Sequence, residues 1–272
     1  MARLSTTDRL ADLRRAYTGE NLSQAVPAVR AGDLLPGAAT EAQRQLEAKV
    51  LVAACTAASV LQLMPPASIV RPTHVVRTAE PGETLRLHLH ERALGPLLFE
   101  LLPRTEGGFG TGVAGLRHQQ HRRSAELTTG DAAIVLAGVD EKAWDLGMRY
   151  VRWMHEFRGV EYVDGGGNDE EINEAATGSA LLRRVHLWHD ASWVRALPLD
   201  GAWFVEWAGG PAEEEIRDRL GHPDFGTPVR VGLRRLDTPG QDVEEGLRTY
   251  PWPAEFVSAV TAAEPDQGPA RR

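Results

Sequence analysis

The sequence contains one cysteine and only two lysines, and these shortages exclude several kinds of chemistry. Cys55 has no second cysteine with which to form an internal disulfide. A lysine that forms a Schiff base or binds a nucleotide phosphate would have to be Lys49 or Lys142. The shortage of lysine, together with many alanines, glycines and arginines, is typical of a bacterial genome of high GC content.

Long hydrophobic runs are also missing. The longest apolar stretch, residues 50–64, is interrupted by small polar residues, and it is shorter than the roughly 18 apolar residues that a membrane-spanning helix needs. Residues 1–15 become charged at once, unlike a secretory signal. We therefore predict a soluble, cytoplasmic protein without a membrane partner.

Acidic side chains outnumber basic ones in the second half of the chain. Residues 1–136 carry 15 basic and 13 acidic side chains, whereas residues 137–272 carry 15 and 25, and the net charge is −8. Such a chain repels polyanions, and this charge disfavours nucleic acid as a partner. The basic run RHQQHRR, residues 117–123, keeps weak nucleic-acid binding through a basic strand as an alternative.

Hydrophobic periodicity predicts an α+β fold that begins with helices. A polar cap at Ser5 or Thr6 opens the first helix, and a capping box at residues 40–43 opens a second one. Alternating apolar residues then indicate an antiparallel β-sheet, because the connections are too short for crossovers. A helix over residues 141–157 packs on it. The predicted strands are residues 67–78, 84–90, 95–102, 122–128 and 131–138.

The glycine-rich run DGGGNDEE, residues 164–171, is the candidate domain boundary, because consecutive glycines favour a flexible loop. Beyond it we expect a smaller half made of a β-meander plus a helix. The expected domains are residues 1–163 and 170–262, followed by a flexible tail over 263–272. In the smaller half, strands are predicted at residues 180–190, 192–199, 202–210 and 229–236, with a helix at 211–223.

Two histidines one residue apart, His88 and His90, stand in the predicted strand TLRLHLH. Side chains alternate across a strand, so the three leucines take the core face while Arg86 and both histidines take the other. Two imidazoles on one face can bind a divalent metal ion when a third ligand arrives from elsewhere. The absence of an identifiable third ligand favours a metal-free sheet with a solvent-facing histidine side.

Gly82 followed by His88-Leu89-His90 is similar to the first motif of the cupin family, and residues 127–138 resemble the start of the second. The resemblance implies a β-barrel with one divalent metal ion in its lumen. The glutamate expected after the second histidine falls on Leu94 or Gly95, and no histidine follows Gly138 at the position of the second motif. A histidine–apolar–histidine strand also resembles that of relaxase nucleases, which use a helix tyrosine; here this would be Tyr150.

The sequence supports three hypotheses of different classes. The first is a binding or accessory protein, with a regulatory role as one option, that has no identifiable catalytic apparatus and no cofactor; its partner would be an unknown protein or small molecule. Its candidate binding surface comprises Arg86, Arg117 and His121. The second is a metal-dependent cupin-like enzyme with His88 and His90 as ligands. The third is weak nucleic-acid binding.

Overall fold

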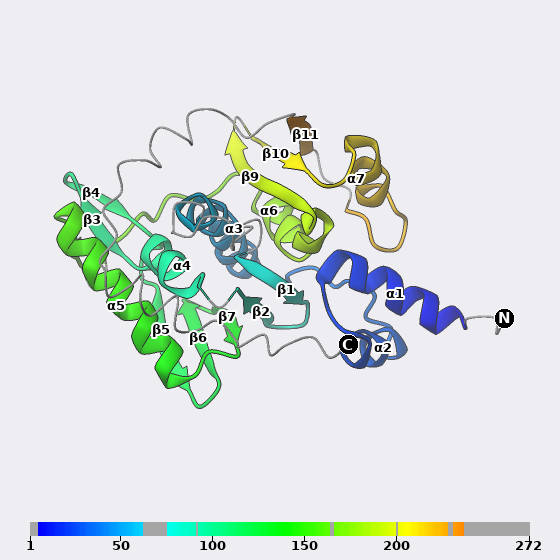
Figure 1. Ribbon diagram of the computed structural model, residues 1–272, viewed down its shortest axis with the longest axis horizontal. Helices are drawn as coiled ribbons and strands as arrows, with labels where there is room; N and C mark the ends of the chain where they lie inside the picture. The colour runs from blue at the N-terminus through cyan, green and yellow to red at the C-terminus, as the bar shows by residue number, and fades with distance from the viewer. Residues whose placement is uncertain are drawn as a thin grey trace, which may run out of the picture.

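The computed structural model describes residues 5–61, 75–90, 92–163, 166–199, 201–227 and 231–236. Within these ranges the chain has the predicted α+β fold with N-terminal helices (Figure 1). The helices are α1 (Thr6–Thr18), α2 (Leu22–Arg30), α3 (Glu41–Leu61), α4 (Leu94–Leu101), α5 (Glu141–Arg158), α6 (Ala175–Leu182) and α7 (Glu213–Leu220), with a short 3-10 helix, η1 (Val185–Trp188).

Three sheets account for the strands. The order β1-β2-β7-β6-β5 forms the largest sheet, β11-β10-β9 the second and β4-β3-β8 the third. The strands are β1 (Val76–Glu80), β2 (Leu85–Leu89), β3 (Arg104–Glu106), β4 (Phe109–Thr111), β5 (Arg117–His121), β6 (Ser124–Thr129), β7 (Ala132–Ala137), β8 (Glu161–Tyr162), β9 (Ala191–Leu199), β10 (Ala202–Gly209) and β11 (Val231–Leu236). Of the first predicted strand, residues 67–74 lie outside the described residues.

Local capping explains where the first helices begin. Ser5 caps α1 in a reciprocal capping box with Asp8. At the start of α3, the Gln43 backbone N–H donates to Thr40 Oγ1 at 3.1 Å. The Gln43 side chain does not complete the predicted box; its amide instead exchanges two hydrogen bonds with the backbone of Ala133. Gln43 thereby joins α3 to the first residues of β7.

The five-stranded sheet is mixed rather than purely antiparallel. β2 and β7 run parallel, with Leu85 opposite Ile134 and Leu87 opposite Leu136, while the other neighbouring pairs are antiparallel. The prediction rested on the short connections between consecutive strands. It failed at this pair because β2 is joined to β7 through α4 and four intervening strands, which is ample chain for a parallel connection.

Residues 95–102, predicted as a strand, instead form α4. Nearly every side chain of α4 is apolar and buried, because α3 and α5 both pack against it. A helix that is buried on all sides has no polar stripe, and periodicity alone does not distinguish it from a buried strand. Pro96 fits because it occupies the first turn, where a helix does not need its N–H.

Residues 180–190 were also wrongly predicted as a strand. They comprise the end of α6, a turn, the 3-10 helix η1 and a second turn that precedes β9. Arg183 and Arg184 interrupt the apolar pattern here, yet both are buried. Because this segment is helical and not extended, the imidazole rings of His186 and His189 stack with centroids 4.3 Å apart, whereas a strand would place them on opposite faces.

The second sheet contains one antiparallel hairpin, β9-β10, followed by a parallel strand, β11, that is reached through α7. The predicted meander therefore holds only for the strands predicted at residues 192–199 and 202–210. Trp203, Val205 and Trp207 lie on one face of β10 and are buried, as expected for a core seam. Glu213 to Glu215 occupy the first turn of α7, where acidic side chains complement the helix dipole.

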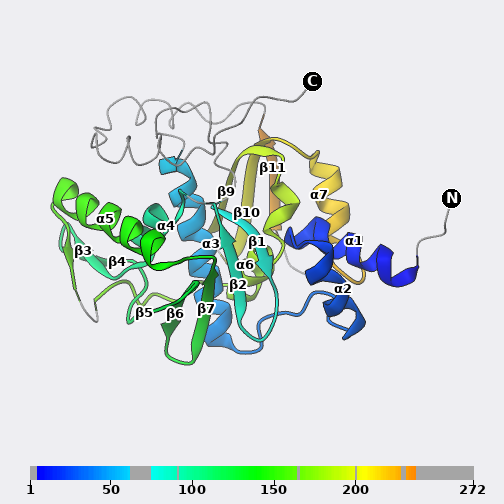
Figure 2. The ribbon, with the colours of Figure 1, turned by 60° about the horizontal axis from the view of Figure 1, so that its bottom comes forward.

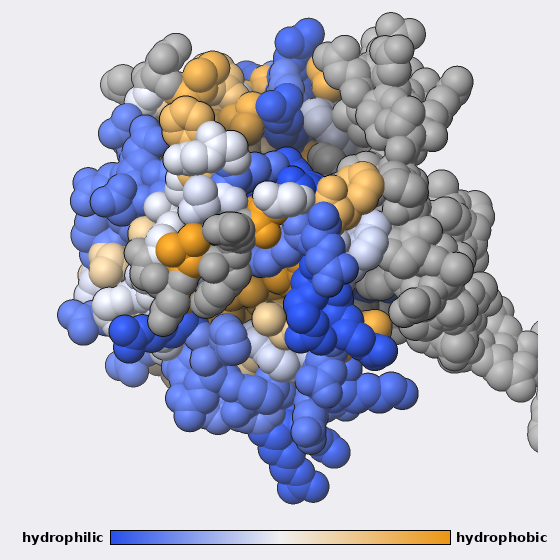
Figure 3. Space-filling model, turned by 90° about the vertical axis from the view of Figure 1, so that its left-hand side faces the viewer, coloured by the Kyte–Doolittle hydropathy of each residue, from blue (hydrophilic) through white to orange (hydrophobic). Residues whose placement is uncertain are grey.

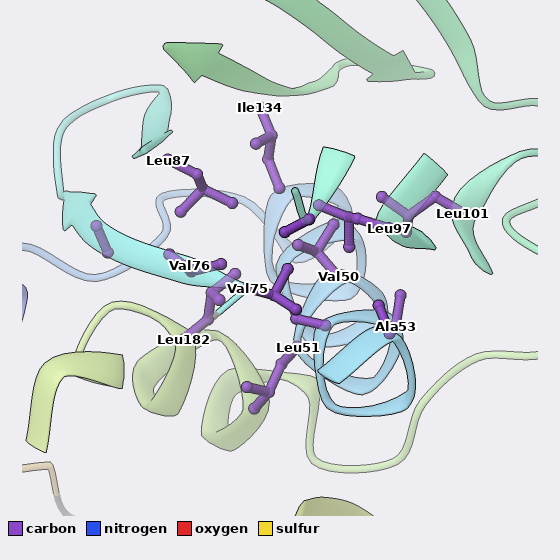
Figure 4. Close-up of a cluster of buried hydrophobic side chains, with 14 of the residues drawn as sticks. Val50, Leu51, Ala53, Val75, Val76, Leu87, Leu97, Leu101, Ile134 and Leu182 are labelled. Atoms are coloured by element: carbon purple, nitrogen blue, oxygen red, sulfur yellow. The ribbon is translucent and has the colours of Figure 1, made fainter. Parts of the chain in front are cut away.

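Helix α3 runs through the middle of the molecule and contacts α4, α6, β7 and β9 (Figure 2). Its residues Val50, Leu51 and Ala53 lie among apolar side chains of the five-stranded sheet and of α4 and α6 (Figure 4). Buried residues on both sides of the glycine-rich run belong to this one cluster. None of the helices in the described ranges combines the length and apolarity needed to cross a membrane.

One end of the molecule carries α5, β3 and β4 (Figure 1), and hydrophobic residues show there between hydrophilic ones (Figure 3). Phe109 on β4 and Phe157 on α5 are 76% and 46% exposed. Phe157 stacks on Trp153, with ring centroids 5.7 Å apart. The surface at this end is therefore partly apolar.

Candidate functional site

The predicted histidine strand exists as β2, and its leucines take the core face. Leu85 and Leu87 are fully buried, whereas Arg86 is exposed and His88 half-buried on the opposite face. The His88 Nε2 atom contacts the Glu80 carboxylate of neighbouring β1, and Arg86 Nε lies 3.6 Å from the same carboxylate. Glu80 therefore holds both basic side chains of β2.

His90 lies just beyond the end of β2. Its backbone N–H donates to Val75 O at 2.9 Å, and its Nδ1 accepts from the Arg92 backbone N–H at 3.4 Å. Among the described residues, no group of three or more His, Cys, Asp or Glu side chains is arranged to hold a metal ion. The His88 and His90 metal site therefore stays a prediction.

The two motifs that resemble cupins lie on neighbouring strands, because β2 pairs with β7. Over the described residues, however, the sheet order runs from β1 at one end to β5 at the other, and these two strands are not paired with each other. The face that carries His88 is thus one side of an open sheet, where the resemblance implied a lumen.

Arg117 and His121 lie on edge strand β5, on the same face of the sheet as Arg86. The register shows this, since partners across the strands link His88, Ala137, Ser124 and His121 in one row. Three strand spacings of about 4.8 Å separate the ends of this row by about 14 Å. Arg86, Arg117 and His121 are all exposed, so the structure gives them a common face without gathering them into one site.

A cavity of about 490 Å³ lies elsewhere, between α3, α4, β3 and the β9–β10 turn. Sequence reasoning missed it, because its residues come from five separate segments. The described residues that line it are Lys49, Val52, Ala53, Thr56, Glu100, Leu101, Arg104, Thr111, Gly112, Val113, Asn168, Glu170, Glu171, Ile172, Asn173, Pro198, Leu199 and Gly201.

One face of α3 forms a wall of the cavity. Lys49, Val52, Ala53 and Thr56 follow the i, i+3, i+4, i+7 spacing that places side chains on one side of a helix. Lys49 is half-buried on this face, and burial lowers the pKa of its ammonium group. The carboxylates of Asp169, Glu171 and Glu170 oppose this shift, so desolvation is the stronger effect.

Lys49 has no close partner in this wall. Within the described ranges, no hydrogen bond involves its side chain and no carboxylate oxygen lies within 4.0 Å of its ammonium nitrogen. An amine in this setting is available to a ligand. The shortage of lysine noted from the sequence was the one signal that pointed to Lys49, although it did not separate Lys49 from Lys142.

The opposite wall brings together a carboxyl group, from Glu100, and a guanidinium group, from Arg104. Glu100 stands at the end of α4, and burial raises the pKa of its carboxyl group although nearby Arg104 acts to lower it. Arg104 Nη2 donates to Glu100 Oε2 at 3.3 Å, and the Arg104 guanidinium stacks 4.2 Å from the centroid of the Phe99 ring. Arg104 is therefore held in place, and it holds Glu100.

Part of the glycine-rich run completes the cavity. The Asn168 backbone N–H donates to Gly112 O at 3.0 Å, and the Ala114 N–H donates to Asn168 O at 3.2 Å. Gly167 has a φ of 105°, and a Cβ there would lie 2.8 Å from the Ala114 nitrogen. Gly167 therefore packs closely against the neighbouring segment, because its lack of a side chain permits this close approach.

Comparisons of the chain with protein-family models, curated proteins and solved structures find no match.

Proposed function

We propose that the protein is a binding or accessory protein that holds a small, largely apolar organic molecule in the cavity beside α3. The observation that carries this proposal is the convergence of apolar side chains with the polar groups of Lys49, Glu100 and Arg104 around a space of about 490 Å³. Ligand pockets of proteins typically have volumes of about 300–1,000 Å³ and combine apolar walls with a few polar groups.

The chemistry of the walls defines the ligand. Val52, Leu101 and Ile172 offer contacts to an apolar body, while Lys49 offers one unpaired polar group. Acidic residues 170 and 171 lie exposed at the rim and disfavour a strongly anionic ligand. A neutral or weakly polar molecule fits this combination best.

Two tryptophan substitutions in α3, one inside the cavity and one outside it, test the proposal. Thr56 is exposed and lines the cavity, so Thr56→Trp fills the space without disturbing the core. Ala42 is exposed on the first turn of the same helix, away from the cavity, and Ala42→Trp is the matched control. Neutral fragments, benzyl alcohol among them, are titrated against both variants by NMR.

Saturable binding that is lost in Thr56→Trp and kept in Ala42→Trp is the expected result. Binding that is equal in both variants, or absent for every fragment with the unmodified protein, contradicts the proposal. A cytoplasmic location, a partner at the Arg86, Arg117 and His121 surface, and weak nucleic-acid binding stay predictions from the sequence.

A further inference from the structure

We infer that Lys49 forms a reversible imine with an aldehyde or ketone ligand in the cavity beside α3. The inference rests on the proposed function, since it names the ligand class of the same cavity. It starts from position: the amine of Lys49 stands on the cavity-facing side of α3, beside Val52 and Ala53. An amine must be neutral to attack a carbonyl carbon.

The surroundings of Lys49 favour the neutral amine. Burial of the side chain disfavours the charged form, and in the described part of the chain no carboxylate lies within ion-pair distance to restore it. Three carboxylates act to raise the pKa of Lys49, those of Asp169, Glu170 and Glu171. They are exposed to solvent, which screens their effect on the amine.

The cavity also offers a proton donor. In imine formation the amine lone pair of Lys49 attacks the carbonyl carbon, the carbonyl oxygen takes up a proton, and the nitrogen loses one proton to give a neutral carbinolamine. The carbon–oxygen bond then breaks and the oxygen leaves as water, which requires a second proton. Glu100 lines the same cavity, and burial keeps its carboxyl group protonated to a higher pH than usual. The nitrogen then gives up its remaining proton, so the net reaction converts amine and carbonyl to imine and water.

Borohydride trapping tests the inference, because it reduces an imine to a stable secondary amine. The full chain is incubated with benzaldehyde and cyanoborohydride, which reduces an imine in preference to the free aldehyde, and the labelled positions are found by peptide mass mapping. The chain supplies its own reference, since its only other lysine, Lys142, is exposed on the first turn of α5. Peptide mapping also separates the label on the N-terminal amine.

The expected result is labelling of Lys49 at least about tenfold faster than Lys142, because the bound aldehyde is held beside the amine. Thr56→Trp and Lys49→Arg remove this label while the melting temperature shows that both variants fold. Glu100→Gln slows the labelling of Lys49 by about 100-fold, as loss of a general acid does. The labelling rate of this variant also depends less on pH, because no carboxyl group at position 100 loses its proton as the pH rises.

Equal labelling of the two lysines, or faster labelling of Lys142, overturns the inference. Benzyl alcohol separates this outcome from failure of the proposed function, because it has the same ring and no carbonyl. If benzyl alcohol binds and Thr56→Trp abolishes its binding, the cavity is a ligand site and only the imine is wrong. If neither compound uses the cavity, both are wrong.

Discussion

The guanidinium of Arg183 forms a two-point ion pair with the carboxylate of Glu47, with Nη2–Oε1 and Nε–Oε2 distances of 2.6 and 2.8 Å. Both side chains are completely buried. Ser179 Oγ donates to Glu47 at 2.6 Å, and Arg183 Nη1 donates to Pro36 O at 2.8 Å. This network fastens α3, in the first half of the chain, to α6, in the second.

Removing one partner of this pair is expected to destabilise the fold strongly. Arg183→Met leaves the Glu47 carboxylate buried without its countercharge, which typically costs about 3–5 kcal/mol. Chemical denaturation measures the change in the free energy of unfolding. Arg217→Met is the control, since it removes an exposed ion pair with Glu213 on α7 and is expected to cost at most about 1 kcal/mol.

The double variant Glu47→Leu with Arg183→Met gives the sharper result. Because it removes both charges together, it is expected to be more stable than Arg183→Met alone. A double variant that loses at least as much stability as both single changes combined would contradict the view that the unpaired charge causes the loss.

Gly178 allows a close approach between α6 and its neighbours. A Cβ at this position would lie 2.3 Å from Trp203 Cζ2 and 2.8 Å from the Ala48 Cβ. Gly178→Ala is therefore expected to destabilise the protein by about 1–3 kcal/mol through overpacking. Gly37→Ala is the matched control, because its Cβ meets no atom within 4 Å, and its effect should stay within about 0.5 kcal/mol. Equal melting temperatures for the two variants would disprove the tight fit.

Helices and strands with one apolar face could be predicted from the sequence, whereas a helix that is buried on all sides could not. The α5 helix, Glu141–Arg158, shows a clear apolar stripe, and the β9 and β10 strands alternate. In contrast, α4 is buried between two helices and carries no stripe, so its leucines fitted a strand equally well. Missing this helix also hid the parallel pairing of β2 with β7.

The candidate site was harder to predict than the fold. Alternation along β2 correctly placed Leu85 and Leu87 inward and Arg86 outward, because this depends only on neighbouring residues. The cavity depends on contacts between distant segments, such as the hydrogen bonds that join Asn168 to Gly112. Its polar residues, Lys49 and Glu100, occur in segments with no motif around them.

Stability is expected to fall as the pH drops through the acidic range, and His186 contributes to this fall. Burial, with a smaller effect of the adjacent His189, lowers the pKa of His186 from its ordinary value of 6.5 to about 4 in the folded protein. Above pH 6.5 both the folded and unfolded states hold it neutral. Between pH 6.5 and about 4 the unfolded state binds the proton first, which favours unfolding.

The variant His186→Gln removes this titration. Its melting temperature should therefore decline less between pH 7 and pH 5 than that of the unmodified protein, by about 2–4 °C. His121→Gln, at an exposed position on β5, should leave the decline unchanged. Identical pH profiles for His186→Gln and the unmodified protein would rule out this role.

The solvent-facing side of β2 gives the final prediction, which concerns metal. His88 Nε2 is engaged by the Glu80 carboxylate, and Gln24 also contacts that carboxylate, so a metal ion would have to displace formed contacts. We expect protein purified without a histidine tag to contain no stoichiometric Fe, Mn, Ni or Zn by elemental analysis. His88→Ala should leave the metal content unchanged and lower stability by at most about 1 kcal/mol, the usual value of a partly exposed pair. Stoichiometric metal that disappears in His88→Ala would instead support the metal-dependent alternative, with His88 and His90 as ligands.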